Sequence, residues 1–369
     1  NGFCRDRLDF VLYRCFSTLV PLPGWRMESA CQSDNKLQKT QLILSKIQDI
    51  KMPLRNPPAH KMTVHKVPSS RLKILALNYA LKKSVRPDVS VENGGLAHSR
   101  KSMERWGTWT PATRGVKVTS CNIEGLYCEE HIPEQLAHDG LLIYMHGGGF
   151  CIGSPRSHRN LVSRIASAAG MRTLAMDYRK APEHPFPAAL NDVIRIYEHA
   201  LSQGVSPEKI GFAGDSAGGN LVLSSLLKLK IDQRPMPAAA CCLSPWTDLT
   251  LSGATLQTRR HLDLILDDTL LQQFSQHYIA GHSRKEATVS PLFGDLAGLP
   301  PLLVQVGAHE VLLDDARRLV ENAHAAGVNA QLEIWDEMQH VWHYTSFFLK
   351  DGQRAISHIG EFFRQHLGA

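Results

Sequence analysis

The stretch Ile210–Asn220, with the sequence IGFAGDSAGGN, decides the fold that we expect for the rest of the chain. Its first four residues are apolar and predict a buried strand, and a helical pattern starts near Asn220. Between them lies the pattern G-x-S-x-G, from Gly214 to Gly218. In a strand–turn–helix setting, this pattern places its serine on a sharp turn with the hydroxyl exposed. Ser216 is therefore a candidate nucleophile; the alternative, a glycine-rich turn without chemistry, explains this setting less well.

Short apolar runs alternate with helix-length segments on both sides of this stretch. The predicted strands lie at residues 141–145, 173–176, 210–213, 238–243, 302–306 and 330–335. The predicted helices lie between and after them, at residues 159–169, 188–203, 220–230, 314–326 and 351–367. Strands that are apolar throughout are typical of a mostly parallel sheet with helices on both faces. The sequence therefore predicts an α/β fold.

Two segments lie outside this alternation. Residues 27–113 contain helical patterns at 42–50 and 71–81, and residues 246–288 contain another helix near 268–278. Ligands bind at the carboxyl ends of the strands in open α/β sheets, so we expect these segments to form a helical cap over that end. The catalytic α/β domain is then residues 114–369. Residues 1–26 precede the first Met and are expected to be a leader, either non-native or disordered.

Composition excludes several classes of protein. The 369 residues are 43% hydrophobic and 21% charged, which is typical of a soluble globular protein and not of a disordered or multi-span membrane protein. The net charge of +6 divides into +11 for residues 1–110 (19 basic, 8 acidic) and −5 for the remainder (22 basic, 27 acidic). The basic part carries no nucleic-acid motif, so we expect no nucleic acid as a partner. Its longest apolar stretch, residues 10–20, is too short to span a membrane and is interrupted by Arg14, so we expect no membrane partner either. Eight cysteines without a C-x-x-C pair predict free thiols and a cytoplasmic location.

The sequence HGGGF, at residues 146–150, directly follows the first of these strands. Three consecutive glycines allow backbone N–H groups to point into a cavity, where they stabilise an oxyanion. A phosphate-binding loop is the alternative, but such a loop has Lys followed by Ser or Thr, where Phe150 and Cys151 stand here. Together with the serine turn, this loop predicts the oxyanion hole of an acyl-transfer enzyme.

A serine nucleophile needs a general base, which in enzymes with this serine turn is a His near the end of the chain. His340 follows the last predicted strand by a few residues, so it is the favoured base. His343 is the rival. An H-x-x-H metal pair is a third interpretation, although no further ligand cluster supports it.

The base needs an acid to orient it, and this acid lies between the serine and the His in the chain. Glu310 stands in the loop after the strand at 302–306 and is the favoured residue. Asp314 is the alternative, although Asp314 and Asp315 also suit the first turn of the next helix.

Taken together, these motifs resemble the hormone-sensitive-lipase-like family of α/β-hydrolases, and in particular its bacterial carboxylesterases. The His340 loop matches, and the other matching stretches are HGGGF (146–150), DYRKAPEHPFPAAL (177–190), GDSAGGN (214–220), SPWTDL (244–249), SPL (290–292) and LPPLLVQVG (299–307). One departure is Glu310, because the family usually has Asp at this position. The resemblance implies an α/β-hydrolase fold with a cap and no need for a cofactor or a metal.

The resemblance also implies roles for individual residues: Ser216 as nucleophile, His340 as base, and the N–H groups of Gly148, Gly149 and Ala217 as the oxyanion hole. Gly147 is an alternative to one of the two glycines. In the DYRKAPEHPFPAAL loop, a buried pair between Arg179 and Glu183 is expected to shape the backbone.

The function implied is that of a serine carboxylesterase that hydrolyses short- to medium-chain acyl esters through a Ser-His-Glu triad and an acyl-enzyme. Its partner is a small-molecule ester, and the protein is expected to be a monomer or a homodimer. An amidase, a deacetylase or a lipase with the same triad is the alternative. A non-catalytic receptor on this scaffold is a weaker one, because His340 is present.

Overall fold

The computed structural model describes residues 62–66, 71–83 and 86–367. The predicted leader, residues 1–26, and the predicted helix at residues 42–50 lie outside this described part. Among the described helices, none combines the length and the apolar composition that crossing a bilayer requires.

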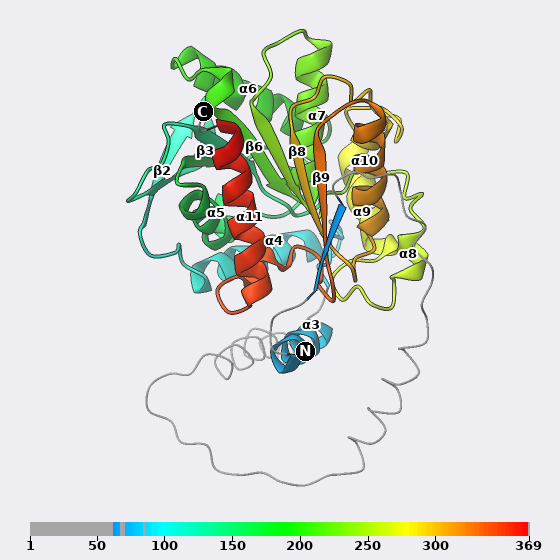
Figure 1. The fold of residues 1–369 in the computed structure, drawn as a ribbon. Helices are drawn as coiled ribbons and strands as arrows, with labels where there is room; N and C mark the ends of the chain where they lie inside the picture. Colours follow the sequence, from blue (N-terminus) through cyan, green and yellow to red (C-terminus); the bar gives the residue numbers. More distant parts are fainter. Residues whose placement is uncertain (1–61, 67–70, 84–85, 368–369) are drawn as a thin grey trace, which may run out of the picture. The chain divides into compact units, whose positions relative to one another are not determined.

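The described strands form one nine-stranded sheet in the order β1-β9-β8-β7-β6-β4-β5-β3-β2 (Figure 1). Their bounds are β1 Met62–His65, β2 Val116–Ile123, β3 Leu126–Pro133, β4 Leu141–Met145, β5 Arg172–Met176, β6 Ile210–Asp215, β7 Ala239–Leu243, β8 Leu302–Gly307 and β9 Ala330–Trp335. Neighbouring strands from β1 to β5 in this order are parallel, whereas β3 is antiparallel to both β5 and β2. The predicted mostly parallel sheet is confirmed.

Helices cover both faces of the sheet, and each face has its own hydrophobic cluster. Leu142 and Tyr144 of β4 pack with residues of α5 and α11, which lie in front of the sheet in Figure 1. Ile143 and Met145 point to the other cluster, with residues of α6, α7 and α10. The helices are α3 Arg71–Lys83, α4 Gly95–Trp109, α5 Pro155–Ala169, α6 Ala188–Ser202, α7 Ala217–Ile231, α8 Thr255–Thr258, α9 Asp268–Ile279, α10 Leu313–Ala325 and α11 Lys350–Leu367, with short 3₁₀ turns η1 Pro207–Lys209, η2 Pro291–Phe293 and η3 Trp342–Thr345.

All six predicted strands are present, as β4 to β9, and the predicted helix at residues 71–81 is α3. The sequence pattern does not predict β1, β2, β3 or α4. In β3, the buried polar residues Glu129 and His131 interrupt the apolar pattern that identifies a buried strand. β1 belongs to the segment expected to lie outside the sheet, yet it pairs with β9 and forms an edge of the sheet.

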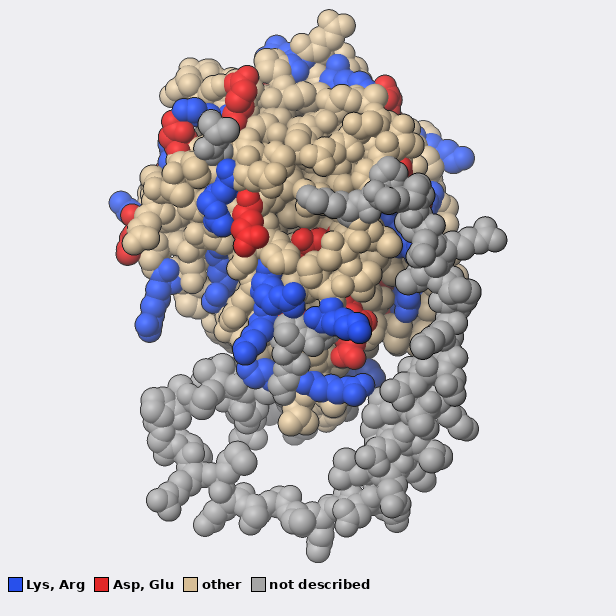
Figure 2. Space-filling model, in the orientation of Figure 1, with Lys and Arg blue, Asp and Glu red and all other residues tan. Residues whose placement is uncertain are grey.

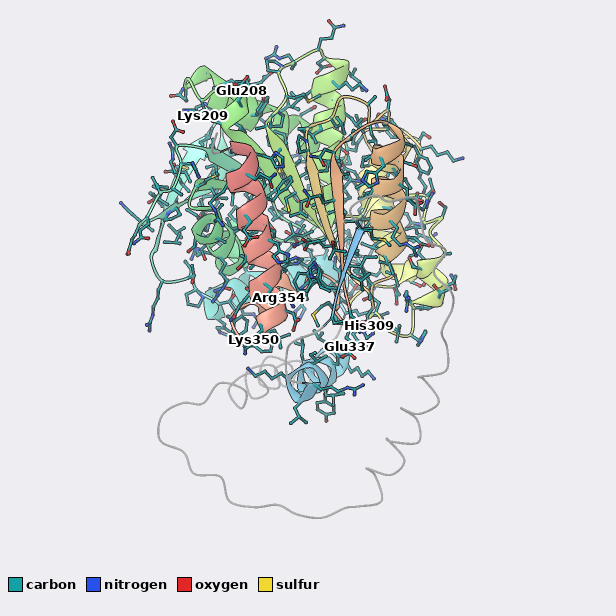
Figure 3. The ribbon with its side chains drawn as sticks, viewed as in Figure 1. Glu208, Lys209, His309, Glu337, Lys350 and Arg354 are labelled. Atoms are coloured by element: carbon teal, nitrogen blue, oxygen red, sulfur yellow. The ribbon has the colours of Figure 1, made fainter. Side chains whose placement is uncertain are left out.

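The carboxyl ends of the parallel strands gather at one end of the sheet. His309 and Glu337, which follow β8 and β9, lie at this end in Figure 3, whereas Glu208 and Lys209, which precede β6, lie at the opposite end. The loops after β4, β6, β8 and β9 therefore meet at the end where ligands bind in such folds.

Charged side chains of both signs share the face seen in Figure 2, with Lys and Arg more frequent in its lower half. Some exposed charges are paired: Arg172 lies 2.6 Å from Glu130, and Lys230 lies 2.7 Å from Asp295. Exposed ion pairs of this kind contribute little to the free energy of unfolding. The two hydrophobic clusters are therefore the main source of stability.

Candidate active site

Ser216 stands on a strained turn between β6 and α7. Its φ of 54° and ψ of −117° lie outside the regions that a residue with a side chain prefers, which costs energy that its surroundings must offset. The neighbouring glycines make the turn possible: a Cβ at Gly214 would lie 2.6 Å from the Gly218 backbone, and one at Gly218 would lie 2.0 Å from the Met145 oxygen. The Ser216 N–H also donates to the Leu243 oxygen at 2.8 Å, which fixes the turn to β7.

The structure brings the three favoured residues together in a hydrogen-bonded chain. His340 Nε2 lies 2.9 Å from Ser216 Oγ, and His340 Nδ1 lies 2.8 Å from Glu310 Oε2. All three side chains are buried. Because a carboxylate accepts but does not donate, Nδ1 carries the proton in this pair. Nε2 is then free to accept the proton of the Ser216 hydroxyl.

Glu310 is held by two further donors. Its Oε1 accepts from Ser244 Oγ at 2.7 Å and from the Gly307 N–H at 2.6 Å. Gly307 is needed here, because a Cβ would lie 2.3 Å from the Met338 oxygen and 2.9 Å from Glu310 Oε1. The bare backbone at Gly307 thus leaves room for a side chain one methylene longer than Asp.

Ser244 is a residue whose part in the site the sequence did not reveal. Besides donating to Glu310, its Oγ accepts from the Val341 N–H at 3.2 Å. It therefore connects the acid to the backbone next to His340. The residue lies in the SPWTDL stretch, but a serine hydroxyl that orients another side chain has no sequence pattern of its own.

The pKa of His340 is raised above its ordinary value. Burial alone would lower it, because a buried imidazolium loses its hydration. The hydrogen bond to Glu310 and the negative charge of that carboxylate outweigh the effect of burial. The same interactions stabilise the imidazolium that forms when His340 takes up a proton.

The rival residues have other partners. His343 Nε2 lies 2.8 Å from Gln305 Oε1, and burial lowers the pKa of His343 to about 3. Asp314 accepts from the Thr255 N–H at 3.0 Å, and Asp314 and Asp315 lie in the first turn of α10. The structure therefore places neither His343 nor Asp314 in the chain that leads to Ser216.

The HGGGF loop has backbone angles that favour glycine at both candidate oxyanion residues. The φ values are 115° at Gly148 and 58° at Gly149, and a Cβ at Gly149 would lie 2.3 Å from the Phe274 ring. Within the described residues, the N–H groups of Gly148 and Gly149 donate to no protein acceptor. The Gly147 N–H, by contrast, donates to Asp215 Oδ1 at 3.0 Å, so it is not available to a ligand.

Asp215 connects this loop to the serine turn. Its Oδ1 accepts from both the Gly147 N–H and, at 2.7 Å, the Tyr144 hydroxyl. Burial alone would raise the pKa of Asp215, but the nearby His158 and the hydrogen bond from the Tyr144 hydroxyl lower it. The ionised carboxylate therefore fixes the glycine loop beside Ser216.

The prediction that Arg179 pairs with Glu183 is wrong. Arg179 pairs with Asp192 at 2.8 Å, and Glu183 pairs with Arg100 of α4 at 2.7 Å. Arg100 is the main cause that lowers the pKa of Glu183 to about 2. The sequence of the loop does not show these partners, because Arg100 lies on α4 and Asp192 lies on α6.

Arg100 also reaches the backbone that follows the glycine loop. Its guanidinium donates to the Cys151 oxygen at 2.7 Å and to the Ala181 oxygen at 2.9 Å. α4 therefore links the loop that follows β4 to the loop that follows β5.

α9, the helix of the second predicted cap segment, lies against the glycine loop. Its Tyr278 ring stacks on Phe150 with 3.6 Å between the ring centroids, and its Phe274 contacts Gly149. This places apolar side chains next to the candidate oxyanion hole.

Comparison with known proteins adds to this geometry. A family model described as the alpha/beta hydrolase fold matches residues 142–344. The chain is similar to an acetyl-hydrolase of Streptomyces hygroscopicus, at 46% identity over 62% of this chain and 76% of that protein. It is also similar to an esterase of Acinetobacter venetianus, at 36% identity over 68% of this chain and 83% of that protein.

Solved structures are similar as well. An esterase from the bacterial hormone-sensitive lipase family has a TM-score of 0.75 and 38% identity, over 80% of this chain and 97% of that chain. The esterase EstE5, in a crystal soaked with p-nitrophenyl butyrate, has a TM-score of 0.76 and 38% identity, over 81% of this chain and 100% of that chain.

Proposed function

Because the chain belongs to the hormone-sensitive-lipase-like family of α/β-hydrolases and is a carboxylic ester hydrolase, we propose that Ser216, His340 and Glu310 form its catalytic triad. The observation that carries this proposal is the continuous hydrogen-bonded chain from Ser216 Oγ through the His340 ring to the Glu310 carboxylate. An amidase, a deacetylase or a lipase would use the same hydrogen-bonded chain, and the esterase names of a relative and a solved neighbour favour ester hydrolysis over them. A non-catalytic receptor would need no such chain.

In the proposed reaction, Ser216 Oγ attacks the ester carbonyl carbon while His340 Nε2 accepts the serine proton. The carbonyl oxygen becomes negative and is stabilised by the N–H groups of Gly148, Gly149 and Ala217. His340 then gives the proton to the leaving alcohol, which leaves an acyl-enzyme on Ser216. Water, deprotonated by His340, attacks this acyl-enzyme and releases the carboxylic acid.

The donors of the proposed oxyanion hole are held in position before the substrate binds. Ala217 is the first residue of α7, where backbone N–H groups lack helical partners and carry partial positive charge. Asp215 holds the glycine loop beside this helix end. Donors fixed in advance stabilise the transition state without the cost of ordering them during the reaction.

We further propose short- to medium-chain acyl esters as substrates. One relative is named an acetyl-hydrolase, and one solved neighbour was soaked with p-nitrophenyl butyrate. In this chain, Phe274 and Tyr278 of α9 occupy the space against Gly149 and Phe150. Apolar rings in this position favour an apolar acyl chain and limit its length.

A panel of p-nitrophenyl esters tests the proposed substrates. We expect kcat/KM to be highest between acetate and hexanoate and at least roughly tenfold lower for palmitate, because each methylene that cannot be buried loses binding energy. Hydrolysis measured with Ser216→Ala under the same conditions is the blank. A kcat/KM that is highest for palmitate would contradict the proposed chain length, although it would leave the proposed triad intact.

A further inference from the structure

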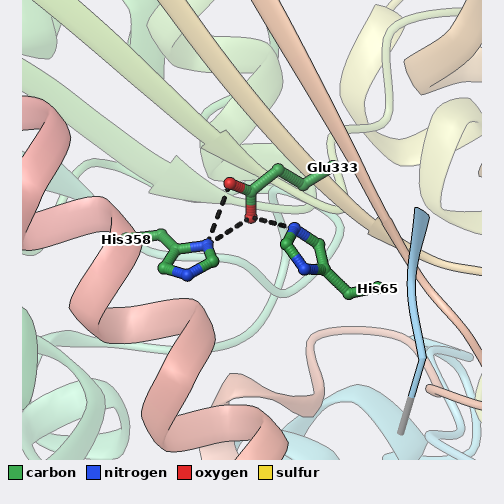
Figure 4. A group of neighbouring side chains, drawn as sticks. All are labelled: His65, Glu333 and His358. Atoms are coloured by element: carbon green, nitrogen blue, oxygen red, sulfur yellow. Dashed lines mark hydrogen bonds and ion pairs between the residues drawn. The ribbon is translucent and has the colours of Figure 1, made fainter. Parts of the chain in front are cut away.

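Three side chains that could ligate a metal meet on the sheet outside the proposed catalytic triad (Figure 4). His65 is the last residue of β1, Glu333 lies on β9, and His358 lies on α11. His358 Nδ1 is 3.0 Å and 3.2 Å from the two oxygens of Glu333, and His65 Nε2 is 3.6 Å from Oε2. The three ligand atoms all lie within 4.8 Å of one another. We refer to these residues as the β1–β9–α11 cluster.

Neighbouring residues hold the cluster in place. The His65 ring stacks on Trp335, with 4.3 Å between centroids and 22° between planes. The Glu333 carboxylate accepts from Gln305 Nε2 at 2.9 Å and from Trp335 Nε1 at 3.2 Å. Metal sites in proteins depend on outer partners of this kind, which fix the orientation of each ligand.

One atom of the cluster has no hydrogen bond, although it lies within ion-pair distance of a carboxylate oxygen. His65 Nε2 is buried and has no hydrogen-bond partner, although it points towards the Glu333 carboxylate. A buried polar atom without a partner is costly, and most proteins avoid it. A cation between the ring and the carboxylate would satisfy both at once, because the imidazole lone pair and the carboxylate oxygen both donate electrons to a metal.

We propose that the β1–β9–α11 cluster binds one Zn²⁺ ion through His65 Nε2, His358 Nδ1 and the Glu333 carboxylate, with water completing the coordination. Two imidazoles and one carboxylate are a ligand set that zinc uses, whereas Mg²⁺ and Ca²⁺ prefer oxygen ligands only. The ion has access from solvent, since about 29% of the His358 side chain is exposed.

The proposed ion has a structural consequence. β1 is four residues long, and among the described strands it lies at the edge of the sheet and pairs with β9 alone. A metal bound by all three residues would link both β1 and α11 to β9. We therefore expect Zn²⁺ to raise the melting temperature, because an ion that binds only the folded state stabilises it.

Calorimetric titration of the metal-free full-length protein with Zn²⁺ tests the proposal. The variants are Glu333→Gln and His358→Ala, and the matched control is His138→Ala, which changes a His outside the cluster. We expect one ion per chain for the unaltered protein and the control. We expect the affinity to fall by at least about 100-fold in both cluster variants, because loss of an outer partner alone costs about 10- to 100-fold. Zn²⁺ should raise the melting temperature only where this affinity is kept.

Two results would overturn the proposal: no zinc binding by the unaltered protein, or equal affinity in the unaltered protein and the cluster variants. Far-UV circular dichroism of each metal-free variant checks that it is folded. If a variant does not fold, the visible absorption of Co²⁺ bound to the unaltered protein tests the site instead. Co²⁺ in a site with two imidazoles should give visible absorption bands that Zn²⁺ removes, and failure of Co²⁺ to give such bands would also count against the site.

Discussion

At the scale of single residues, the acid is where this chain departs from the usual pattern of its family. A Glu reaches one methylene further than an Asp, so its carboxylate needs more space behind the His. Gly307 provides that space, and Ser244 together with the Gly307 N–H fixes the oxygen that does not contact His340. The longer acid is therefore matched by its surroundings, which supports Glu310 as the proposed catalytic acid.

Separate substitutions of the two candidate acids distinguish them. We expect Glu310→Ala to lower kcat by roughly 10³- to 10⁴-fold, since His340 loses the group that orients its ring and stabilises its charge. Asp314→Ala should change kcat by less than about tenfold, because Asp314 contacts the Thr255 backbone instead. Steady-state kinetics on p-nitrophenyl butyrate measures both, and a larger loss from Asp314→Ala would reverse the assignment.

The raised pKa of His340 predicts the pH dependence of activity. Only the neutral ring accepts the Ser216 proton, and a raised pKa keeps the ring protonated at pH values above its ordinary pKa of 6.5. kcat/KM should therefore rise with pH, with the midpoint of the rise above 6.5. In Glu310→Gln, the midpoint should move to lower pH, because the negative charge that raises the pKa is gone. A midpoint that stays in place in this variant would show that Glu310 does not act on His340.

At the scale of elements, α4 connects parts of the site that are distant in the sequence. Arg100 reaches the backbone oxygens of Cys151 and Ala181 and also pairs with Glu183. Asp215 thus accepts a hydrogen bond from the start of the glycine loop, and Arg100 donates to the backbone just after it. The geometry of the proposed oxyanion hole therefore depends on a helix that contributes no group to the proposed reaction.

Removal of this support should reduce both activity and stability. We expect Arg100→Ala to lower kcat/KM by roughly tenfold, because the loop donors lose their alignment. The free energy of unfolding should fall by about 1–3 kcal/mol, since two backbone oxygens lose a charged donor. Lys101→Ala, an exposed neighbour on the same helix, is the control and should change neither. Urea unfolding and ester kinetics measure the two effects, and equal behaviour of the two variants would contradict this role.

The elements also show why sequence patterns predict part of the structure. β4 to β9 are apolar along most or all of their length, and buried parallel strands need that composition, so all six were predicted. β3 contains the buried residues Glu129 and His131, and Arg159 of α5 pairs with the carboxylate of Glu129. A strand whose buried acid pairs with an arginine of a distant helix does not differ locally from a loop. β1 is too short to show an alternating pattern at all.

At the scale of the whole molecule, the order of the motifs along the chain was sufficient to predict which loops meet. Parallel strands bring residues after β4, β6, β8 and β9 to one end of the sheet, and Ser216, Glu310 and His340 all follow such strands. Partners that come from outside this order, such as Arg100 for Glu183, could not be predicted. The same holds for Ser244, whose importance depends on the direction of one hydroxyl group. The cap formed by both outer segments, the oligomeric state and the location stay predictions.

The nucleophile is the central claim, and removal of its oxygen tests it most directly. Ser216→Ala deletes one atom from a buried side chain, so far-UV circular dichroism and the melting temperature should show a folded protein. For this folded variant we predict that kcat/KM for p-nitrophenyl butyrate falls by about 10⁴-fold or more, because no acyl-enzyme forms. A folded Ser216→Ala protein with nearly unchanged kcat/KM would contradict the proposed mechanism.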